Sequence, residues 1–84
     1  MLQYQSCIKS VCLDIMARVG GLYQLGKLTT EQMRSISSDI QSAMKGNGFE
    51  KLINDLREME ESLQEPDRIF SETLDEILKE VYAL

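Results

Sequence analysis

Apolar side chains recur at intervals of three and four residues along most of this 84-residue chain, and this spacing restricts its fold more than any other feature. Residues three and four apart lie on the same face of an α-helix, whereas no segment keeps the period of two that a half-buried strand requires. We therefore predict four amphipathic helices and no sheet. The four apolar stripes are Ile8, Cys12, Ile15, Val19 and Leu22; Met33, Ile36, Ile40, Ala43 and Met44; Leu52, Ile53, Leu56, Met59 and Leu63; and Phe70, Leu74, Ile77, Leu78 and Val81.

The start of the second helix has the clearest local pattern. Thr29 suits the N-cap, because its hydroxyl can accept a hydrogen bond from the backbone of Gln32, whose side chain can bond back to the Thr29 backbone. Leu28 and Met33 flank this capping box as a hydrophobic staple. Gly26, just before it, suits the left-handed residue that ends a helix. A short turn therefore separates the first two helices.

Two adjacent glycines leave the course of the first helix open. Gly20 and Gly21 together cost a helix interior about 2 kcal/mol relative to two alanines. Either the helix kinks or ends at this pair, or the glycines let another helix approach closely while the apolar stripe continues. We favour continuation to about Gln24.

The remaining boundaries are predicted from single residues. Gly46 suits the end of the second helix, and Asn47 suits the N-cap of the third. Pro66 suits the first position of the fourth helix with Asp67 beside it, although Ser71 offers a later cap. Connectors this short make successive helices antiparallel, which predicts one all-α domain, residues 1–84, folded as a four-helix up-and-down bundle. The predicted helices span residues 3–24, 30–45, 48–64 and 67–82.

Charge is distributed unevenly along the chain. Residues 1–48 contain five basic and three acidic side chains, a net charge of +2, whereas residues 49–84 contain four basic and eleven acidic side chains, a net charge of −7. The total of −5 repels nucleic acid and anionic lipid, but it attracts basic proteins and speeds their encounter. We therefore expect a basic protein partner, no direct contact with nucleic acid and no membrane association.

The residue types that most catalytic and metal sites need are absent or poorly spaced. The chain has no histidine, and its two cysteines, Cys7 and Cys12, are five positions apart, which prevents a disulfide within one helix. It has no calcium-binding or phosphate-binding loop. Two glutamate rows fall opposite the apolar stripes, as solvated carboxylates do. We predict a protein that is not an enzyme and holds no metal or cofactor. The rows are Glu58, Glu61 and Glu65, and Glu72, Glu76 and Glu80.

The first eighteen residues also bear on location. Reduced, buried thiols are the expected state of Cys7 and Cys12, and this favours a cytoplasmic protein. Lys9, Asp14 and Arg18 interrupt the apolar residues of this region. We therefore expect neither a signal peptide nor a membrane span.

The acidic second half provides the candidate binding surface. Its carboxylates can simply keep a small domain soluble. Glutamates four residues apart, however, repel each other and destabilise a helix by a few tenths of a kcal/mol per pair, which a positively charged partner would offset. We therefore predict an interface at the junction of the third and fourth helices and along the fourth. Its predicted residues are Asp55, Glu58, Glu61, Glu65, Asp67, Glu72, Asp75 and Glu76.

Two segments resemble a known family. Residues 25–33, LGKLTTEQM, lead into a polar helix, and residues 64–68, QEPDR, precede the acidic stretch LDEILKEV of residues 74–81. Together they resemble the small helical immunity proteins that bacteria make against colicin D and related contact-delivered nuclease toxins. The resemblance covers about half of the chain. It implies a cytosolic antitoxin that covers the active site of a basic nuclease domain, with carboxylates in place of substrate phosphates.

Two other functions stay open. An assembly or secretion chaperone, or a regulatory adaptor, would bind its partner through an apolar groove, for which methionines provide an adaptable surface. A self-associating bundle, such as a homodimer, would share its apolar stripes between copies. High salt weakens only the charge-driven interface steeply, so salt sensitivity separates that interface from the groove. The methionines are Met1, Met16, Met33, Met44 and Met59.

Overall fold

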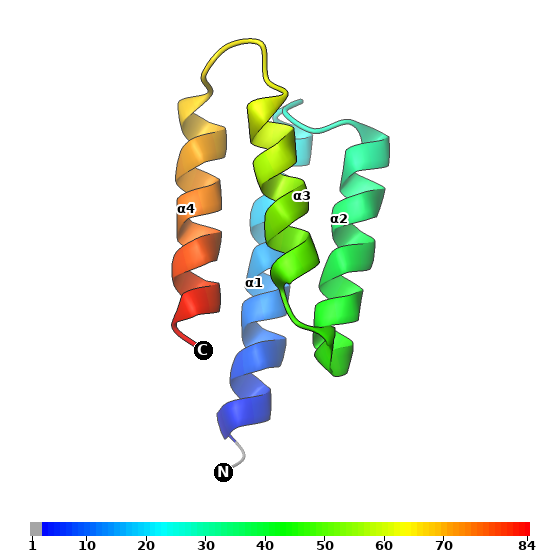
Figure 1. Cartoon of the computed structure of the whole chain (residues 1–84), viewed down its shortest axis with the longest axis vertical. Coiled ribbons are helices and arrows are strands. Elements are labelled where there is room, and N and C mark those ends of the chain that lie inside the picture. Colours follow the sequence, from blue (N-terminus) through cyan, green and yellow to red (C-terminus); the bar gives the residue numbers. More distant parts are fainter. Residues whose placement is uncertain (1–2) are drawn as a thin grey trace.

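Four helices and one short π-helical turn make up most of the chain. The computed structural model describes the backbone of residues 3–84 and the side chains of residues 8–84. The predicted all-α, four-helix up-and-down bundle is confirmed, and no residue of 3–84 lies in a strand (Figure 1). The elements are α1 (Gln3–Gln24), α2 (Thr30–Ser42), η1 (Ala43–Asn47), α3 (Glu50–Glu61) and α4 (Arg68–Tyr82).

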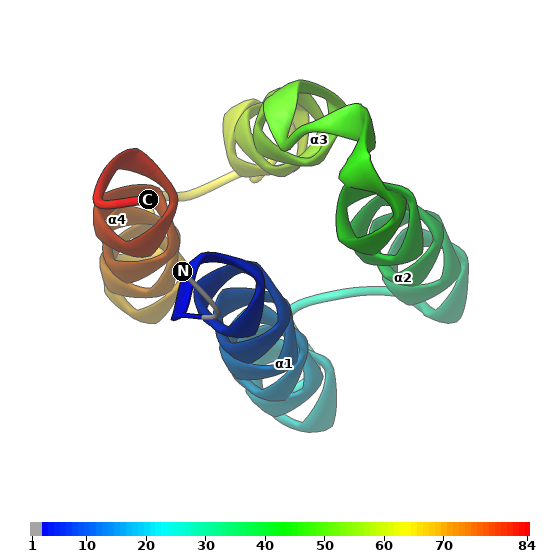
Figure 2. The ribbon, with the colours of Figure 1, turned by 90° about the horizontal axis from the view of Figure 1, so that it is seen from below.

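Each helix packs against two neighbours, so that the four helices occupy the corners of a square. Contacts join α1 to α2 and α4, and they join α3 to the same two helices (Figure 2). The bundle measures 44 × 21 × 20 Å. The α1/α2 edge, which contains the mildly basic half of the sequence, therefore lies opposite the α3/α4 edge, which contains the acidic half.

Residues of all four predicted apolar stripes meet in one core, but Met44 of the second stripe is exposed. Full burial of a large aliphatic or aromatic side chain contributes about 1.5 to 3 kcal/mol, so this shared core is the main source of stability. Cys12 is fully buried, and burial raises the pKa of its thiol, whereas the Cys7 side chain lies outside the described residues. The core consists of Cys12, Ile15, Val19, Leu22, Leu28, Ile36, Ile40, Ala43, Leu52, Leu56, Phe70, Leu74 and Ile77.

The predicted capping box at the start of α2 is confirmed. Thr29 Oγ1 accepts a hydrogen bond from the Gln32 backbone N–H at 3.1 Å, and Gln32 Oε1 accepts one from the Thr29 backbone N–H at 2.9 Å. Leu28 is buried in the core and Met33 packs against it, as a hydrophobic staple requires. Two backbone N–H groups of the first turn are thereby satisfied.

Helix α1 continues through Gly20 and Gly21 to Gln24, as favoured from the sequence. Gly26 ends it with a φ of 76°, and the Lys27 N–H bonds to the Leu22 carbonyl at 2.9 Å in a left-handed stop. A side chain at either Gly20 or Gly21 would meet no atom within 4 Å, so the pair does not serve close helix packing within the described chain. Neither α1 nor any other described helix is long and apolar enough to cross a membrane.

The predicted start and end of the third helix are wrong by a few residues. Asn47 does not cap α3; its side-chain amide donates to Ser42 Oγ at 3.1 Å, and Gly48, with a φ of 84°, delays the helix to Glu50. At the other end, Ser62 Oγ donates to the Met59 carbonyl at 2.8 Å, so a side chain satisfies a carbonyl of the last turn and α3 ends at Glu61. Residues 62–64 lie in the connecting loop rather than in the helix.

The fourth helix begins one residue later than predicted, at Arg68. Asp67 is the N-cap, in an extended backbone conformation, and its Oδ1 accepts a hydrogen bond from the Phe70 N–H at 3.0 Å. Pro66 therefore precedes the cap instead of occupying the first helical position, and Ser71 is not the cap. Asp67 is the N-cap because its carboxylate accepts a hydrogen bond from a first-turn N–H, which a proline side chain cannot do.

Candidate functional site

Six of the eight predicted partner-binding carboxylates are exposed, and we call these six the acidic face. They lie on the end of α3, on the α3–α4 loop and along the outer side of α4. The other two, Asp55 and Asp67, are half-buried and bond to other parts of the bundle. The acidic face therefore consists of Glu58, Glu61, Glu65, Glu72, Asp75 and Glu76.

Hydrogen bonds anchor the α3–α4 loop, which carries Glu65, to both helices. Ser71 Oγ of α4 donates to Glu60 Oε2 of α3 at 2.6 Å, across the loop. Ser62 and Asp67 close its two ends through the helix-terminal bonds described above. Because both ends of the α3–α4 loop are anchored, the loop can adopt fewer positions. The carboxylates on and beside this loop are therefore held together before any partner binds.

Asp67 links the start of α4 to the α1–α2 loop. Its Oδ2 lies 2.7 Å from Lys27 Nζ, and both side chains are largely shielded from solvent. The bond from Lys27, and then the N–H of Phe70, lower the pKa of the Asp67 carboxyl. The charge of Asp67 is therefore paired within the protein, although the sequence predicted Asp67 as a partner-binding residue.

Asp55 belongs to a second internal cluster, between α2 and α3. Lys51 Nζ lies 3.1 Å from Asp55 Oδ2 and 3.4 Å from Asp39 Oδ1 of α2. Hydrogen bonding to Asp39, and then to Lys51, lowers the pKa of Asp55. This carboxylate thus lies on the α2 side of α3 and away from α4.

Asp39 is a buried carboxyl that sequence reasoning missed. Only 5% of it is exposed, and its Oδ2 is buried without a hydrogen-bond partner among the described residues. Burial, and then the neighbouring Asp55, raises its pKa to about 6, while Lys51 opposes the rise. The spacing contained a clue, because Asp39 follows Ile36 by three positions and precedes Ile40 directly, which places it beside the apolar stripe.

The two predicted glutamate rows are not intact. Glu65 lies beyond the end of α3, so it does not continue the helical spacing of Glu58 and Glu61. Glu80 does not share the outer side of α4; it is half-buried, and its Oε1 lies 3.4 Å from Arg18 Nη2 of α1. Burial, and then Asp14, raises the pKa of Glu80. Repulsion within rows is therefore weaker than the sequence suggested.

Some carboxylates of the acidic face have ion-pair partners on their own helix. Arg68 Nε lies 3.1 Å from Glu72, and Lys79 Nζ lies 3.5 Å from Glu76. Such exposed pairs contribute little, because water and salt screen them, and they can exchange for a partner's charges. No basic group lies within ion-pair distance of the other four among the described side chains. These four are Glu58, Glu61, Glu65 and Asp75.

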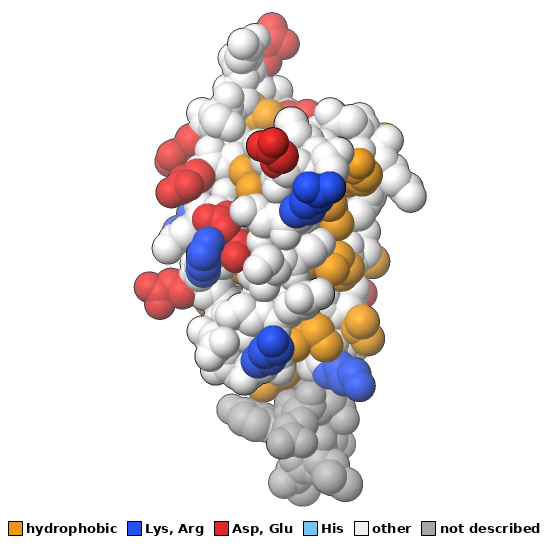
Figure 3. All heavy atoms as spheres, turned by 90° about the vertical axis from the view of Figure 1, so that its right-hand side faces the viewer, with side chains coloured by type: hydrophobic (Ala, Val, Ile, Leu, Met, Phe, Trp, Pro, Cys, Tyr) orange, Lys and Arg blue, Asp and Glu red, His pale blue; other side chains and the backbone are white. Residues whose placement is uncertain are grey.

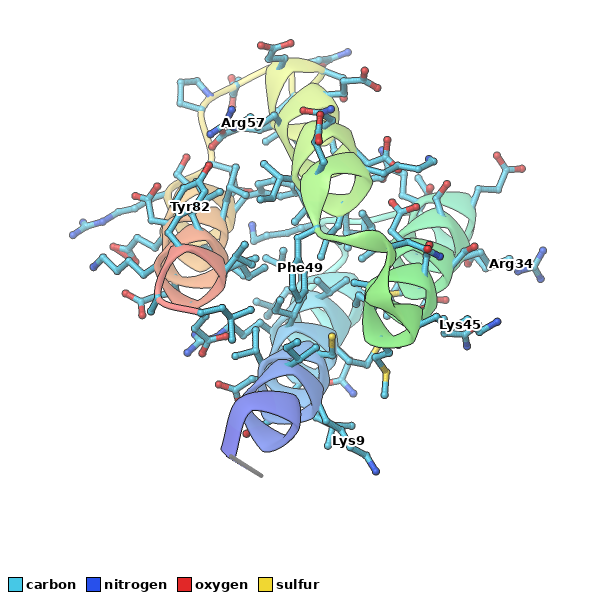
Figure 4. The ribbon with its side chains drawn as sticks, turned by 60° about the horizontal axis from the view of Figure 1, so that its bottom comes forward. Lys9, Arg34, Lys45, Phe49, Arg57 and Tyr82 are labelled. Atoms are coloured by element: carbon cyan, nitrogen blue, oxygen red, sulfur yellow. The ribbon has the colours of Figure 1, made fainter. Side chains whose placement is uncertain are left out.

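A shallow groove between the start of α3 and the end of α4 contains none of the six residues of the acidic face. It has a volume of about 410 Å³, and its lining includes Phe49, Arg57 and Tyr82 (Figure 4). Phe49 packs against the core, so the floor of the groove is apolar. No group of three acidic or cysteine side chains among the described residues is placed to hold a metal ion.

Comparison of the chain with protein-family models, with curated proteins and with solved structures finds no match. The resemblance to immunity proteins therefore stays a prediction. The functional argument rests on the exposed side chains themselves.

Proposed function

We propose that this protein is a binding protein that neutralises a basic partner, and that the partner is the catalytic domain of a nuclease toxin. The observation that carries the proposal is the acidic face, with its six exposed carboxylates. It lies on the α3/α4 edge of the bundle, and residues 49–84, which form this edge, have a net charge of −7. Complementary charge of this kind steers a basic partner to the correct face and opposes acidic ones.

The chemistry of nuclease inhibition suits this surface. A nuclease binds the phosphates of its substrate with lysine and arginine side chains, and carboxylates form the same charge-assisted hydrogen bonds. Four carboxylates of the acidic face have no ion-pair partner in the described chain, so no internal bond has to break before they bind. Their positions on two packed helices and an anchored loop reduce the entropy lost on binding.

The proposal assigns the protein to the class of immunity proteins or antitoxins and places it in the cytoplasm, where its partner would degrade nucleic acid. It also assigns the protein no catalytic step. Binding alone would block the nuclease, because the acidic face would occupy the surface that substrate needs.

Charge reversal on the acidic face tests the proposal. The triple variant Glu58→Lys, Glu61→Lys and Glu65→Lys is compared with wild type for affinity toward the catalytic domain of a basic nuclease toxin, at several salt concentrations. We expect an affinity loss of about a hundredfold at low salt and a flatter salt dependence, since three attractions become repulsions.

The exposed Glu31 lies in the first turn of α2, outside the acidic face, and Glu31→Lys serves as the control. It should leave affinity for the nuclease domain within a few fold of wild type. Circular dichroism of each variant confirms that the fold is intact. Unchanged affinity and unchanged salt dependence in the triple variant would refute the proposed function.

A further inference from the structure

Three of the five methionines belong to α1, α2 and η1, and we call Met16, Met33 and Met44 the methionine seam. Met33 lies four positions before Ser37 on the same face of α2, and Met44 lines a groove with Ile8 and Lys9 of α1. Met16 and Met33 are half-buried against the core, whereas Met44 of η1 is 42% exposed. The helices meet at this seam, since Ser37 Oγ of α2 donates to Met16 Sδ of α1 at 3.9 Å. The described residues therefore cover the seam only in part.

The methionine seam opens into a groove near the start of α1. The groove has a volume of about 390 Å³ and is lined by Ile8 and Lys9 of α1 and by residues 43–46. Leu13, which lies between Lys9 and Met16 at helical spacing, is 59% exposed. Figure 3 shows hydrophobic side chains in a column along this flank of the molecule. Met33 and Met44 are eleven positions apart, which corresponds to about 16 Å along a helix.

Basic side chains surround the methionine seam. Lys9, Arg34 and Lys45 extend from α1, α2 and η1 on the same side of the bundle (Figure 4). All three are exposed, and none lies within ion-pair distance of a carboxylate among the described side chains. Residues 1–7 contain no acidic side chain that would pair with them. The seam thus combines an apolar floor with an uncompensated positive rim.

We propose that the methionine seam and its basic rim bind an amphipathic α-helix of another protein, one with apolar residues on one face and carboxylates beside them. An extended peptide would need an unpaired strand edge to bond with, and α1 and α2 offer none. A helix satisfies its own backbone hydrogen bonds, so we infer that the ligand is a helix. Its carboxylates face the three basic residues of the rim. Methionine side chains adapt to ligands of varied shape, as at other helix-binding grooves.

A second copy of this chain fits the site poorly. The copy would have to present its acidic α3/α4 edge, which lies opposite the α1/α2 edge. Contact between two different edges does not close into a two-fold dimer, so it would produce rings or open chains of many copies. An anionic membrane is also disfavoured, because surfaces that bind it typically contain about four to eight basic residues and this chain carries a net charge of −5. A different protein is the occupant that the charges favour.

This inference is independent of the acidic face, since it uses none of its carboxylates. Three designed peptides serve as probes: a helix with leucines on one face and glutamates beside them, the same helix with lysines for glutamates, and the glutamate helix interrupted by a central proline. Binding to the full chain is followed by the methyl NMR signals of the methionines. Met59 of α3 is an internal control, because it lines a hollow between α2 and α3 with Gln32 and Ser35 and not the seam between α1 and α2.

The glutamate helix should shift the methyl signals of Met16, Met33 and Met44 and leave that of Met59 unchanged. The lysine helix and the proline-interrupted peptide should each bind at least about tenfold more weakly, since one loses the charge attraction and the other the helical shape.

Matched substitutions locate the binding site. Leu13→Ser, and separately the pair Lys9→Glu and Lys45→Glu, should weaken binding of the glutamate helix by about tenfold. Their controls, Ile69→Ser and Lys79→Glu, remove an exposed apolar residue and a basic residue from α4 and should leave binding unchanged. All five side chains are exposed, and circular dichroism of each variant separates loss of folding from loss of binding.

Four results would overturn the inference. The first is no binding of the glutamate helix. The second is equal binding of all three peptides, and the third is binding of the chain to anionic phospholipid vesicles that Leu13→Ser abolishes. The fourth is concentration-dependent sedimentation that Leu13→Ser abolishes, which would assign the seam to a second copy of the chain.

Discussion

Replacement of Asp39 by asparagine should stabilise the protein at neutral pH and have little effect in acid. The Asp39 carboxyl is 95% shielded and lies beside Asp55, and these surroundings disfavour its ionised form. Lys51 provides only partial compensation, because its side chain is 75% exposed. Asparagine keeps the shape of the side chain and removes the charge.

The pH dependence follows from the raised pKa. The carboxyl of Asp39 titrates near its ordinary value of 3.8 in the unfolded chain and at about 6 in the folded one. Between these values the folded state holds a proton that the unfolded state has lost, so the stability contributed by this group falls as pH rises from about 4 to about 6. A shift of roughly two units corresponds to about 3 kcal/mol. We therefore expect the variant to gain about 1 to 3 kcal/mol more at pH 7.5 than at pH 4.

Urea unfolding followed by far-UV circular dichroism measures this difference, with wild type and Asp39→Asn compared at both pH values. Asp55 acts at and below its ordinary pKa, and its hydrogen bond with Asp39 is the first cause of the lowering. Asparagine is the substitution that alters this least, because its amide N–H can still donate to the Asp55 carboxylate. Asp75→Asn on the exposed side of α4 is the control and should give the same small change at both pH values. A gain for Asp39→Asn that is equal at both pH values, or larger at pH 4, would refute the reasoning.

Two further predictions concern helix stability. Thr29→Ala removes one half of the capping box and should destabilise the protein by about 1 kcal/mol in urea unfolding, whereas Thr29→Ser should cost less because it keeps the hydroxyl. Gly20→Ala and Gly21→Ala should each stabilise the protein by about 0.5 to 1 kcal/mol, since an added methyl group meets open space in a continuous helix. A lower melting temperature for either variant would contradict this and show that another group packs on this turn.

The fold was predictable because several patterns agreed. Apolar residues at helical spacing specified four helices, and the capping box at Thr29 fixed the start of α2. Asn47 was misassigned as a cap because local sequence did not reveal that Gly48 would also turn the chain. Pro66 was misplaced because Asp67 is the cap, and the Asp67 carboxylate also bonds to Lys27, forty positions earlier, a contact that local sequence does not reveal.

The candidate site was less predictable than the fold. The excess of carboxylates in residues 49–84 was evident from composition, but their partners were not. Arg18 and Glu80 come from opposite ends of the chain, and so they meet only when α1 packs against α4. The role of Asp39 likewise depends on how α2 packs against α3. Contacts between helices decide which charges are left for a partner, and these contacts are not encoded in local spacing.

An even number of antiparallel helices places the start of α1 and the end of α4 at the same end of the bundle (Figure 1). The α3–α4 loop, with Glu65, lies at the other end. A carrier attached ahead of Gln3 would therefore stand next to the groove lined by Ile8 and Lys9 and far from the corner of the acidic face. The choice of attachment point in a surface-binding experiment thus determines which of the two surfaces a partner can reach.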